Sequence, residues 1–326
     1  MTSSPDRRQE PIGSGFSAST TAAEVLAGRD LTGTRALVTG GYSGLGTEIV
    51  RALTGAGAHV VVPARRPAAA REVLAEVAPA ELVTTDELDL GDLASVRGFA
   101  ERLLAGGGHL DVVIDNAGVM ACPEERVGPG WERQLATNHL GHFALVNLLW
   151  PAVTAAPGGA RVVSVSSRGH HVSGVRWDDP MFGRGYDKWE AYGQSKTANA
   201  LFALHLDELG RAHGVRAFSL HPGGIMTPLQ RHLPQQEMVG RGWIDEQGNV
   251  IGPGFKTPAQ GAATATWAAT SPRLDGLGGL YLEDCDVAAV ATEAGASGVR
   301  EYACDPEQAA RLWALSADLT GVDAFA

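Results

Sequence analysis

A short apolar run, residues 35–38, leads directly into a turn that contains Gly40, Gly44 and Gly46. Helical periodicity begins at Leu45, so the turn joins a predicted strand to a predicted helix. Glycines let the main chain approach a pyrophosphate closely, and the first N–H groups of the helix face that anion unpaired. The chain holds 42 glycines, so such a turn alone says little. Its place after the first strand favours a dinucleotide-binding site.

The rest of the chain alternates short apolar runs with longer amphipathic segments. Further strands are predicted at 58–62, 81–85, 110–114, 161–165, 215–220 and 279–282. Helices are predicted at 45–53, 67–77, 92–104, 131–153, 188–209, 258–270 and 306–319. This alternation is typical of βαβ units, whose parallel strands are covered by helices on both faces. We therefore expect an α/β fold, a Rossmann-type doubly wound parallel sheet of about seven strands, as a single domain over residues 29–326.

Three segments stand outside this alternation. Residues 1–28 are predicted to form an N-terminal arm that is mobile in its Ser-, Gly- and Pro-rich first part. Within the arm, Thr21 and Glu24 have the spacing of a capping box, which predicts a short helix. Residues 169–187 and 229–254 follow predicted strand ends, where ligands bind in open α/β sheets. Both are predicted to be lids over a substrate.

Composition excludes several kinds of partner. The 26 Lys and Arg residues against 37 Asp and Glu residues give a net charge of −11, so no nucleic-acid partner is expected. No apolar run is long enough for a membrane span, and no apolar signal segment follows the N-terminus. The cysteines are three and widely spaced, which favours a reducing, cytoplasmic location over a disulfide framework. The adjacent His170 and His171 lack a third ligand at zinc-like spacing, so no metal is expected.

The end of the second predicted strand indicates which dinucleotide is bound. An acidic residue there would bind the ribose 2′-hydroxyl of NAD. This chain instead has Ala64 followed by Arg65 and Arg66. A small residue and two guanidinium groups suit a 2′-phosphate, which arginine binds through charge-assisted hydrogen bonds. The predicted cofactor is NADP(H); the alternative is that both arginines are only solvated.

Tyr192 and Lys196 stand one helical turn apart on one face of a predicted helix. A phenol with a pKa near 10 exchanges protons poorly at neutral pH, and a nearby ammonium together with a cationic nicotinamide would lower that pKa. Such a tyrosine could give a proton to a carbonyl oxygen or take one from an alcohol. Only three of the 26 basic residues are lysines, so a lysine here suggests a specific role. The alternative is an ordinary surface Tyr and Lys.

Taken together, the motifs resemble the short-chain dehydrogenase/reductase superfamily over about residues 30–320. In chain order they are the glycine turn, Asn116-Ala117-Gly118, Asn138, Ser166-Ser167, Tyr192 with Lys196, and His221-Pro222-Gly223. The segments 138–143 and 192–199 resemble the retinol dehydrogenase and protochlorophyllide reductase branch. Residues 278–285 resemble uncharacterised bacterial oxidoreductases of that branch, and the Ala- and Arg-rich composition resembles that of high-GC actinobacteria.

The resemblance implies catalytic roles for four residues. Tyr192 would be the acid/base, and Lys196 would hold the ribose hydroxyls and lower the Tyr192 pKa. Ser167 would hydrogen-bond the substrate oxygen. Ser166 is the alternative, because the usual short spacing from serine to tyrosine is longer here. Asn138 would hold a water molecule that links Lys196 to solvent.

The resemblance also implies a set of cofactor contacts. Asn116 would line the cleft after the fourth strand, and Asp89 would meet the adenine. The segment after His221 would meet the nicotinamide amide. The residues expected to contact the cofactor are Gly40, Tyr42, Ser43, Gly44, Leu45, Gly46, Arg65, Arg66, Asp89, Leu90, Asn116, Ala117, Gly118, Tyr192, Lys196, Pro222, Gly223, Ile225 and Thr227.

The function implied is NADP(H)-dependent interconversion of a carbonyl and an alcohol. Apolar residues in and beside the lids favour a mid-sized hydrophobic substrate; they are Met181, Phe182, Ile225, Leu229, Leu233, Met238 and Trp243. One alternative is a dinucleotide-sensing protein without turnover, but such relatives typically lack the Tyr or the Lys. Another is an epimerase or dehydratase with a resident cofactor, whose glycine turn usually has a different spacing. The predicted helices 131–153 and 188–209 resemble those that pair relatives, so a homodimer or homotetramer is expected.

Overall fold

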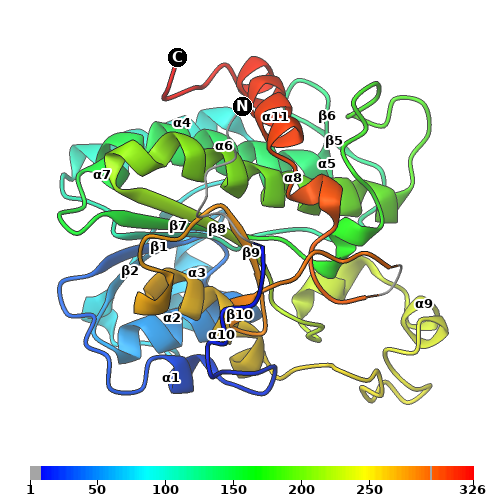
Figure 1. Cartoon of the computed structure of the whole chain (residues 1–326), viewed down its shortest axis with the longest axis horizontal. Coiled ribbons are helices and arrows are strands. Elements are labelled where there is room, and N and C mark those ends of the chain that lie inside the picture. The colour runs from blue at the N-terminus through cyan, green and yellow to red at the C-terminus, as the bar shows by residue number, and fades with distance from the viewer. Residues whose placement is uncertain (1–8, 294–295) are drawn as a thin grey trace.

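Seven parallel strands and one antiparallel strand form the central sheet, in the order β10-β9-β8-β7-β4-β1-β2-β3 (Figure 1). The computed structural model describes residues 9–293 and 296–326, so the first eight residues of the predicted arm lie outside the described residues. The strands are β1 (Arg35–Val38), β2 (His59–Ala64), β3 (Val83–Glu87), β4 (Val112–Asp115), β7 (Ala160–Val165), β8 (Val215–His221), β9 (Leu280–Glu283) and β10 (Asp286–Val287). The predicted doubly wound parallel sheet is confirmed, with β10 as an addition.

Helices cover both faces of this sheet (Figure 1). The helices on one face are α1 (Ala22–Val25), α2 (Leu45–Gly55), α3 (Pro67–Leu74) and α10 (Pro258–Thr270). The helices on the other face are α4 (Leu93–Ala105), α6 (Gly141–Leu148), α7 (Trp150–Thr154), α8 (Lys188–Gly210) and α11 (Pro306–Thr320). Covering on both faces explains why β2 is buried at every position after His59, since parallel strands in such sheets have no solvent face.

The predicted helix over residues 131–153 is wrong in its continuity. The segment begins with β6 (Trp131–Glu132), which forms a short hairpin with the preceding β5 (Arg126–Val127), and continues as α5 (Arg133–Leu135). The buried Glu132 carboxylate then caps α5 by accepting the N–H groups of residues 134 and 135 at 2.9 and 2.7 Å. A π-helical turn, Ala136–Leu140, separates α5 from α6. Such turns insert one extra residue into a helix and occur often at functional sites.

Residues 9–17 of the N-terminal arm, which were predicted to be mobile, are hydrogen-bonded to the edge of the sheet. The side-chain amide of Gln9 pairs with the main chain of Tyr281, accepting its N–H at 3.0 Å and donating to its carbonyl at 2.7 Å. The N–H groups of Ile12 and Ser14 donate to the Asp286 carboxylate at 2.8 and 3.0 Å. These bonds fasten the segment to β9 and β10. The predicted capping-box helix follows as α1.

The C-terminal helix α11 covers the helices that were predicted to pair two copies. Trp313 stacks on Phe202 of α8 with a centroid distance of 5.9 Å and meets Phe143 of α6 edge-on at 4.8 Å. Ser316 bonds to His139 at 2.7 Å. Pairing of copies through these helices stays a prediction, and α11 already occupies part of their surface within one chain.

Asp115, at the end of β4, has both carboxylate oxygens buried without a partner among the described residues. Burial raises its pKa well above the usual range, so the folded chain favours the neutral acid. Stability is then complete below the unfolded pKa of about 4 and is lost as the pH rises through the folded pKa, at up to about 1.4 kcal/mol per pH unit. Asp115→Asn keeps the shape and cannot ionise. We expect urea unfolding to show the variant gaining stability over the wild type from pH 4 to pH 8. A constant difference, or a loss at pH 8, would contradict this account.

Candidate active site

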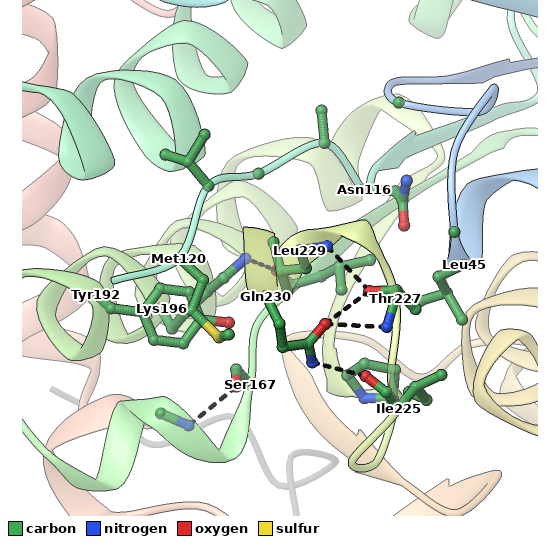
Figure 2. Close-up of a pocket in the computed structure, with 18 of the residues that line it drawn as sticks. Leu45, Asn116, Met120, Ser167, Tyr192, Lys196, Ile225, Thr227, Leu229 and Gln230 are labelled. Atoms are coloured by element: carbon green, nitrogen blue, oxygen red, sulfur yellow. Dashed lines mark hydrogen bonds between the residues drawn. The ribbon is translucent and has the colours of Figure 1, made fainter. Parts of the chain in front are cut away.

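A cleft of about 1300 Å³ runs along the carboxyl ends of β1, β4, β7 and β8 (Figure 2). This edge includes the point where the chain order of the strands reverses, between β1 and β4, which is where open α/β sheets bind ligands. Gly46 and Asn138 are the two predicted site residues that do not line it. Those that do are Gly40, Tyr42, Ser43, Gly44, Leu45, Arg65, Arg66, Asp89, Leu90, Asn116, Ala117, Gly118, Ser167, Tyr192, Lys196, Pro222, Gly223, Ile225 and Thr227.

The glycine turn has no room for side chains. A Cβ on Gly46 would lie 2.2 Å from the Gly40 carbonyl oxygen, so only glycine permits the close packing of α2 on β1. Gly44 has a φ of +53°, and a Cβ there would lie 3.1 Å from the Thr227 Cβ. The main chain at the N-terminus of α2 is therefore not covered by side chains of these glycines and faces the cleft, with Thr227 on the opposite side. This cradle fits the pyrophosphate of a dinucleotide.

Asn116 ties the end of β4 to the end of β1. Its main-chain N–H donates to the Thr39 hydroxyl at 2.9 Å and its side-chain amide donates to the Thr39 carbonyl at 2.8 Å. The same hydroxyl bonds to His142 Nε2 at 2.8 Å, and His142 Nδ1 bonds to the Asn138 carbonyl at 2.9 Å. Burial lowers the pKa of His142 to about 4, so its ring is neutral. His142 therefore joins two strand ends to the π-helical turn.

Asn138 is fully buried in the π-helical turn. Its side-chain oxygen accepts the Val119 N–H at 2.8 Å, and its amide donates to the Val119 carbonyl and to Ser195 Oγ, both at 2.9 Å. A Cβ on Gly118 would lie 3.2 Å from Asn138 Oδ1 and 3.7 Å from Lys196 Nζ. Asn138 thus holds the segment that passes Lys196, and its role toward a water molecule stays a prediction.

Tyr192 and Lys196 both reach the cleft from α8 (Figure 2). The Lys196 ammonium donates to the Val165 carbonyl at 2.8 Å and lies 5.8 Å from the centre of the Tyr192 ring. Burial raises the pKa of Tyr192 to about 12, with the Ser167 hydroxyl opposing the rise, and burial lowers the pKa of Lys196 to about 7. Desolvation is the largest cause of both shifts. The predicted lowering of the phenol pKa, which depends on the cationic nicotinamide as well as on Lys196, stays a prediction.

The two serines after β7 lie in different surroundings. The Ser166 hydroxyl is buried and donates to the Lys196 carbonyl at 2.6 Å. The Ser167 hydroxyl accepts the Gly169 N–H at 3.0 Å, and it acts on the Tyr192 phenol by lowering its pKa against the effect of burial. A Cβ on Gly169 would lie 2.6 Å from Tyr192 Cε1, so glycine is needed for the ring to pack there. The geometry favours Ser167 as the serine beside the acid/base.

Arginines surround the far end of the cleft. Arg65 and Arg66 are exposed and line it directly after the buried Ala64. Arg231, on the 3-10 turn Pro228–His232, also lines the cleft, and its pKa is lowered by burial and by the charges of Arg65 and Arg133. Sequence reasoning missed Arg231, although its place four residues after Thr227 was a signal. This concentration of positive charge suits an anionic cofactor.

The two predicted lids differ in outcome. From 169–187, only Gly169, His171 and Val172, with Arg168 before them, line the cleft. Phe182 is instead buried against the Arg176 guanidinium, 4.3 Å from its ring centre. Of the apolar residues expected in and beside the lids, three line the cleft, Ile225, Leu229 and Trp243; the other four, Met181, Phe182, Leu233 and Met238, do not. From the second lid, the cleft-lining residues include Leu229, Arg231, Arg241 and Trp243.

Among the residues that the structure describes, no group of three or more His, Cys, Asp or Glu side chains is arranged to hold a metal ion. Likewise, none of the helices placed by the structure combines the length and apolar character that a membrane crossing requires.

Comparison with known proteins identifies the family. The family model described as short chain dehydrogenase matches residues 34–238, which is more than half of the chain. The chain belongs to the short-chain dehydrogenase/reductase family. This membership confirms the resemblance on which the site predictions depend.

Individual relatives of this short-chain dehydrogenase cover nearly its whole length. It is 48% identical over 296 residues to a probable oxidoreductase of Streptomyces lividans, covering 89% of this chain and 98% of the relative. It is 34% identical over 297 residues to human retinol dehydrogenase 12, covering 90% of this chain and 88% of that relative. An uncharacterised protein from Mycobacterium Paratuberculosis has a similar structure, with a TM-score of 0.72, 32% identity and coverage of 94% and 99%. The NADP complex of Pseudomonas aeruginosa RhlG matches with a TM-score of 0.60 and 25% identity, covering 78% of this chain and 95% of that structure.

Proposed function

We propose that this short-chain dehydrogenase uses NADP(H) to interconvert a carbonyl and an alcohol on a mid-sized hydrophobic substrate. The observation that carries the proposal is that Ser167, Tyr192 and Lys196 line the same cleft as the glycine cradle. When bound, NADP(H) would supply or accept the hydride. The proposed compartment is the cytoplasm, which agrees with the three cysteines being unpaired.

The residues of the chain divide the work between them. Ser167 would hold the substrate oxygen next to Tyr192, and Tyr192 would give that oxygen its proton or take it back. Because the pKa of Tyr192 is about 12, the phenol is protonated at neutral pH, which is the form needed to reduce a carbonyl. Lys196 would hold the ribose hydroxyls, and Asn138 would keep the adjoining segment in place.

Net turnover separates this proposal from its alternatives. A dinucleotide-sensing protein would bind NADPH without consuming it, and an epimerase or dehydratase would return its cofactor unchanged. Absorbance of NADPH followed with a panel of ketones and aldehydes should show net oxidation of the cofactor. Tight NADPH binding with no net oxidation across the panel would favour the sensing protein.

Cofactor choice is predicted to depend on Arg65. A hydrogen bond to a charged group contributes about 1.5–3 kcal/mol, which is roughly a ten- to hundredfold preference for NADPH over NADH. Arg65→Ala is expected to raise the Kd for NADPH by about that factor and to leave the Kd for NADH nearly unchanged. Added salt should weaken NADPH binding more than NADH binding, since the contact is partly screened. Calorimetry with both cofactors measures these effects.

The matched control is Arg71→Ala, an arginine of α3 that does not line the cleft and bonds instead to Thr85. It should leave both dissociation constants unchanged. If the wild type binds NADH as tightly as NADPH, the arginines are only surface charges and the choice of NADP(H) fails. The chemistry assigned to Tyr192 would still stand in that case.

A further inference from the structure

Three aromatic side chains, which we call the aromatic wall, line the cleft beyond Tyr192. They are Trp189 of α8, Trp243 of the second lid, and Phe255, and all three are half-buried. The Trp189 ring centre lies 6.5 Å from that of Tyr192 at an interplanar angle of 86°. Trp243 follows at 6.0 Å from Trp189 and 89°, and Phe255 at 6.1 Å from Trp243 and 62°. The wall therefore continues from the reacting residue in edge-to-face steps.

Polar contacts hold Trp189 in the wall. The Trp189 indole N–H donates to the Glu237 carboxylate at 2.8 Å, and Lys188 pairs with the same carboxylate at 2.6 Å. The Arg241 guanidinium lies 3.8 Å from the centre of the Trp189 ring and 3.6 Å from Glu237. Trp189 thus has its polar N–H already bonded. What it offers to a ligand is aromatic surface.

Apolar side chains complete this part of the cleft. Met120 and Leu229 line it beside Tyr192 (Figure 2), and both belong to one apolar cluster with Trp189 and Trp243. The hydroxyl groups of Tyr192 and Ser167 stand at one end of this surface. A ligand here would have its oxygen bonded at that end and the rest of it in apolar and aromatic contact.

We propose that the substrate is a carbonyl compound conjugated directly to an aromatic ring, an aryl ketone or aryl aldehyde. This inference rests on the proposed function. Aromatic rings attract each other edge-to-face at centroid distances of about 4.5–7 Å. Since the Trp189 ring lies 6.5 Å from the Tyr192 ring, a group bonded to the carbonyl carbon at Tyr192 lies within reach of the wall. The wall selects a ring there over a saturated group of the same size.

The test compares two ketones that differ only in ring saturation, acetophenone and cyclohexyl methyl ketone. Their Kd values are measured by calorimetry on the protein saturated with NADP⁺, which cannot reduce them. Trp243→Leu keeps an apolar side chain and removes the ring. We expect it to reduce the preference for acetophenone over the cyclohexyl ketone by about tenfold, the effect of one to two aromatic pairs. The ratio of the two Kd values is compared between the proteins, because a change in the general hydrophobicity of the cleft affects both ketones alike.

The matched control is Trp177→Leu, since Trp177 lies outside the cleft, bonded to Gln308 at 2.8 Å and stacked on Arg311. It should leave the preference unchanged. The same preference in the wild type and in Trp243→Leu would overturn the proposal, as would a wild type that binds the two ketones equally. Failure of the proposed function can be distinguished from failure of this inference. The first would appear as absence of net NADPH oxidation, and the second as a Kd ratio of the two ketones that does not depend on the aromatic wall.

Discussion

Replacing Tyr192 by phenylalanine is expected to lower kcat for carbonyl reduction by at least about a hundredfold, the lower end for loss of a general acid. The substitution removes only the hydroxyl and keeps the ring, whose packing requires a glycine at position 169. The cradle for the cofactor lies on other elements. The Kd for NADPH should therefore be nearly unchanged, and stopped-flow absorbance with a fluorescence titration measures both quantities.

The matched control for this change is Tyr186→Phe. Tyr186 lies outside the cleft and donates to the Cys122 carbonyl at 3.0 Å, so its variant tests loss of a phenol hydroxyl in general. Its kcat should stay close to that of the wild type. Near-wild-type turnover by Tyr192→Phe would remove the acid/base from the mechanism.

The direction of the reaction adds a dependence on pH. Because burial raises the pKa of Tyr192 to about 12, the phenol stays protonated across the neutral range, as reduction requires. Oxidation of an alcohol requires the phenolate, which becomes more populated as the pH rises. The rate of alcohol oxidation should therefore increase with pH through the neutral range more steeply than the rate of reduction.

The parallel strands could be predicted from the sequence because each is a short run of apolar residues between turn signals. β10 could not, since it has only two residues and follows a turn with unusual residues. Asp284 and Cys285 have φ values of +53° and +60°, positions where Gly or Asn would normally mark a two-residue hairpin. The Lys256 ammonium pairs with Asp284, and this long-range contact is invisible in the local pattern.

The interruption of the predicted helix 131–153 was hidden for a different reason. Its apolar side chains are buried on every side, between the sheet, α4 and α11, so periodicity does not report where one turn has an extra residue. Pro151 was the visible signal for a new helix start, since proline is favoured in the first turn. The π-helical turn depends on contacts of Asn138 with Val119, nineteen residues away.

The candidate site also contains both features that local sequence encodes and features that depend on long-range contacts. Motifs in which neighbouring residues act together, such as the glycine turn or Tyr192 with Lys196, could be recognised from their spacing and their place in the chain. The contact between His142 and Thr39, and the meeting of Trp189 with Trp243, join residues far apart in the chain. No local pattern encodes them. The order of the strands brings them together.

The choice between Ser166 and Ser167 was open from the sequence, and the structure turns it into a quantitative prediction. Ser167→Ala removes a hydroxyl that lines the cleft together with Tyr192 and lowers the pKa of its phenol. Loss of one preorganised donor to a reacting oxygen costs about 10²- to 10³-fold in kcat. We expect a fall in kcat in that range, measured by NADPH absorbance, with an unchanged Kd for NADPH.

Ser166→Ala is the matched comparison, because it deletes the same atom from the adjacent residue. Its hydroxyl donates to the Lys196 carbonyl inside α8, so its loss should reduce the free energy of unfolding by about 1 kcal/mol. The kcat of this variant should stay within about threefold of the wild type, since no donor to the substrate is lost. The reverse pattern, with Ser166→Ala inactive and Ser167→Ala active, would reassign the oxygen-binding role to the buried serine.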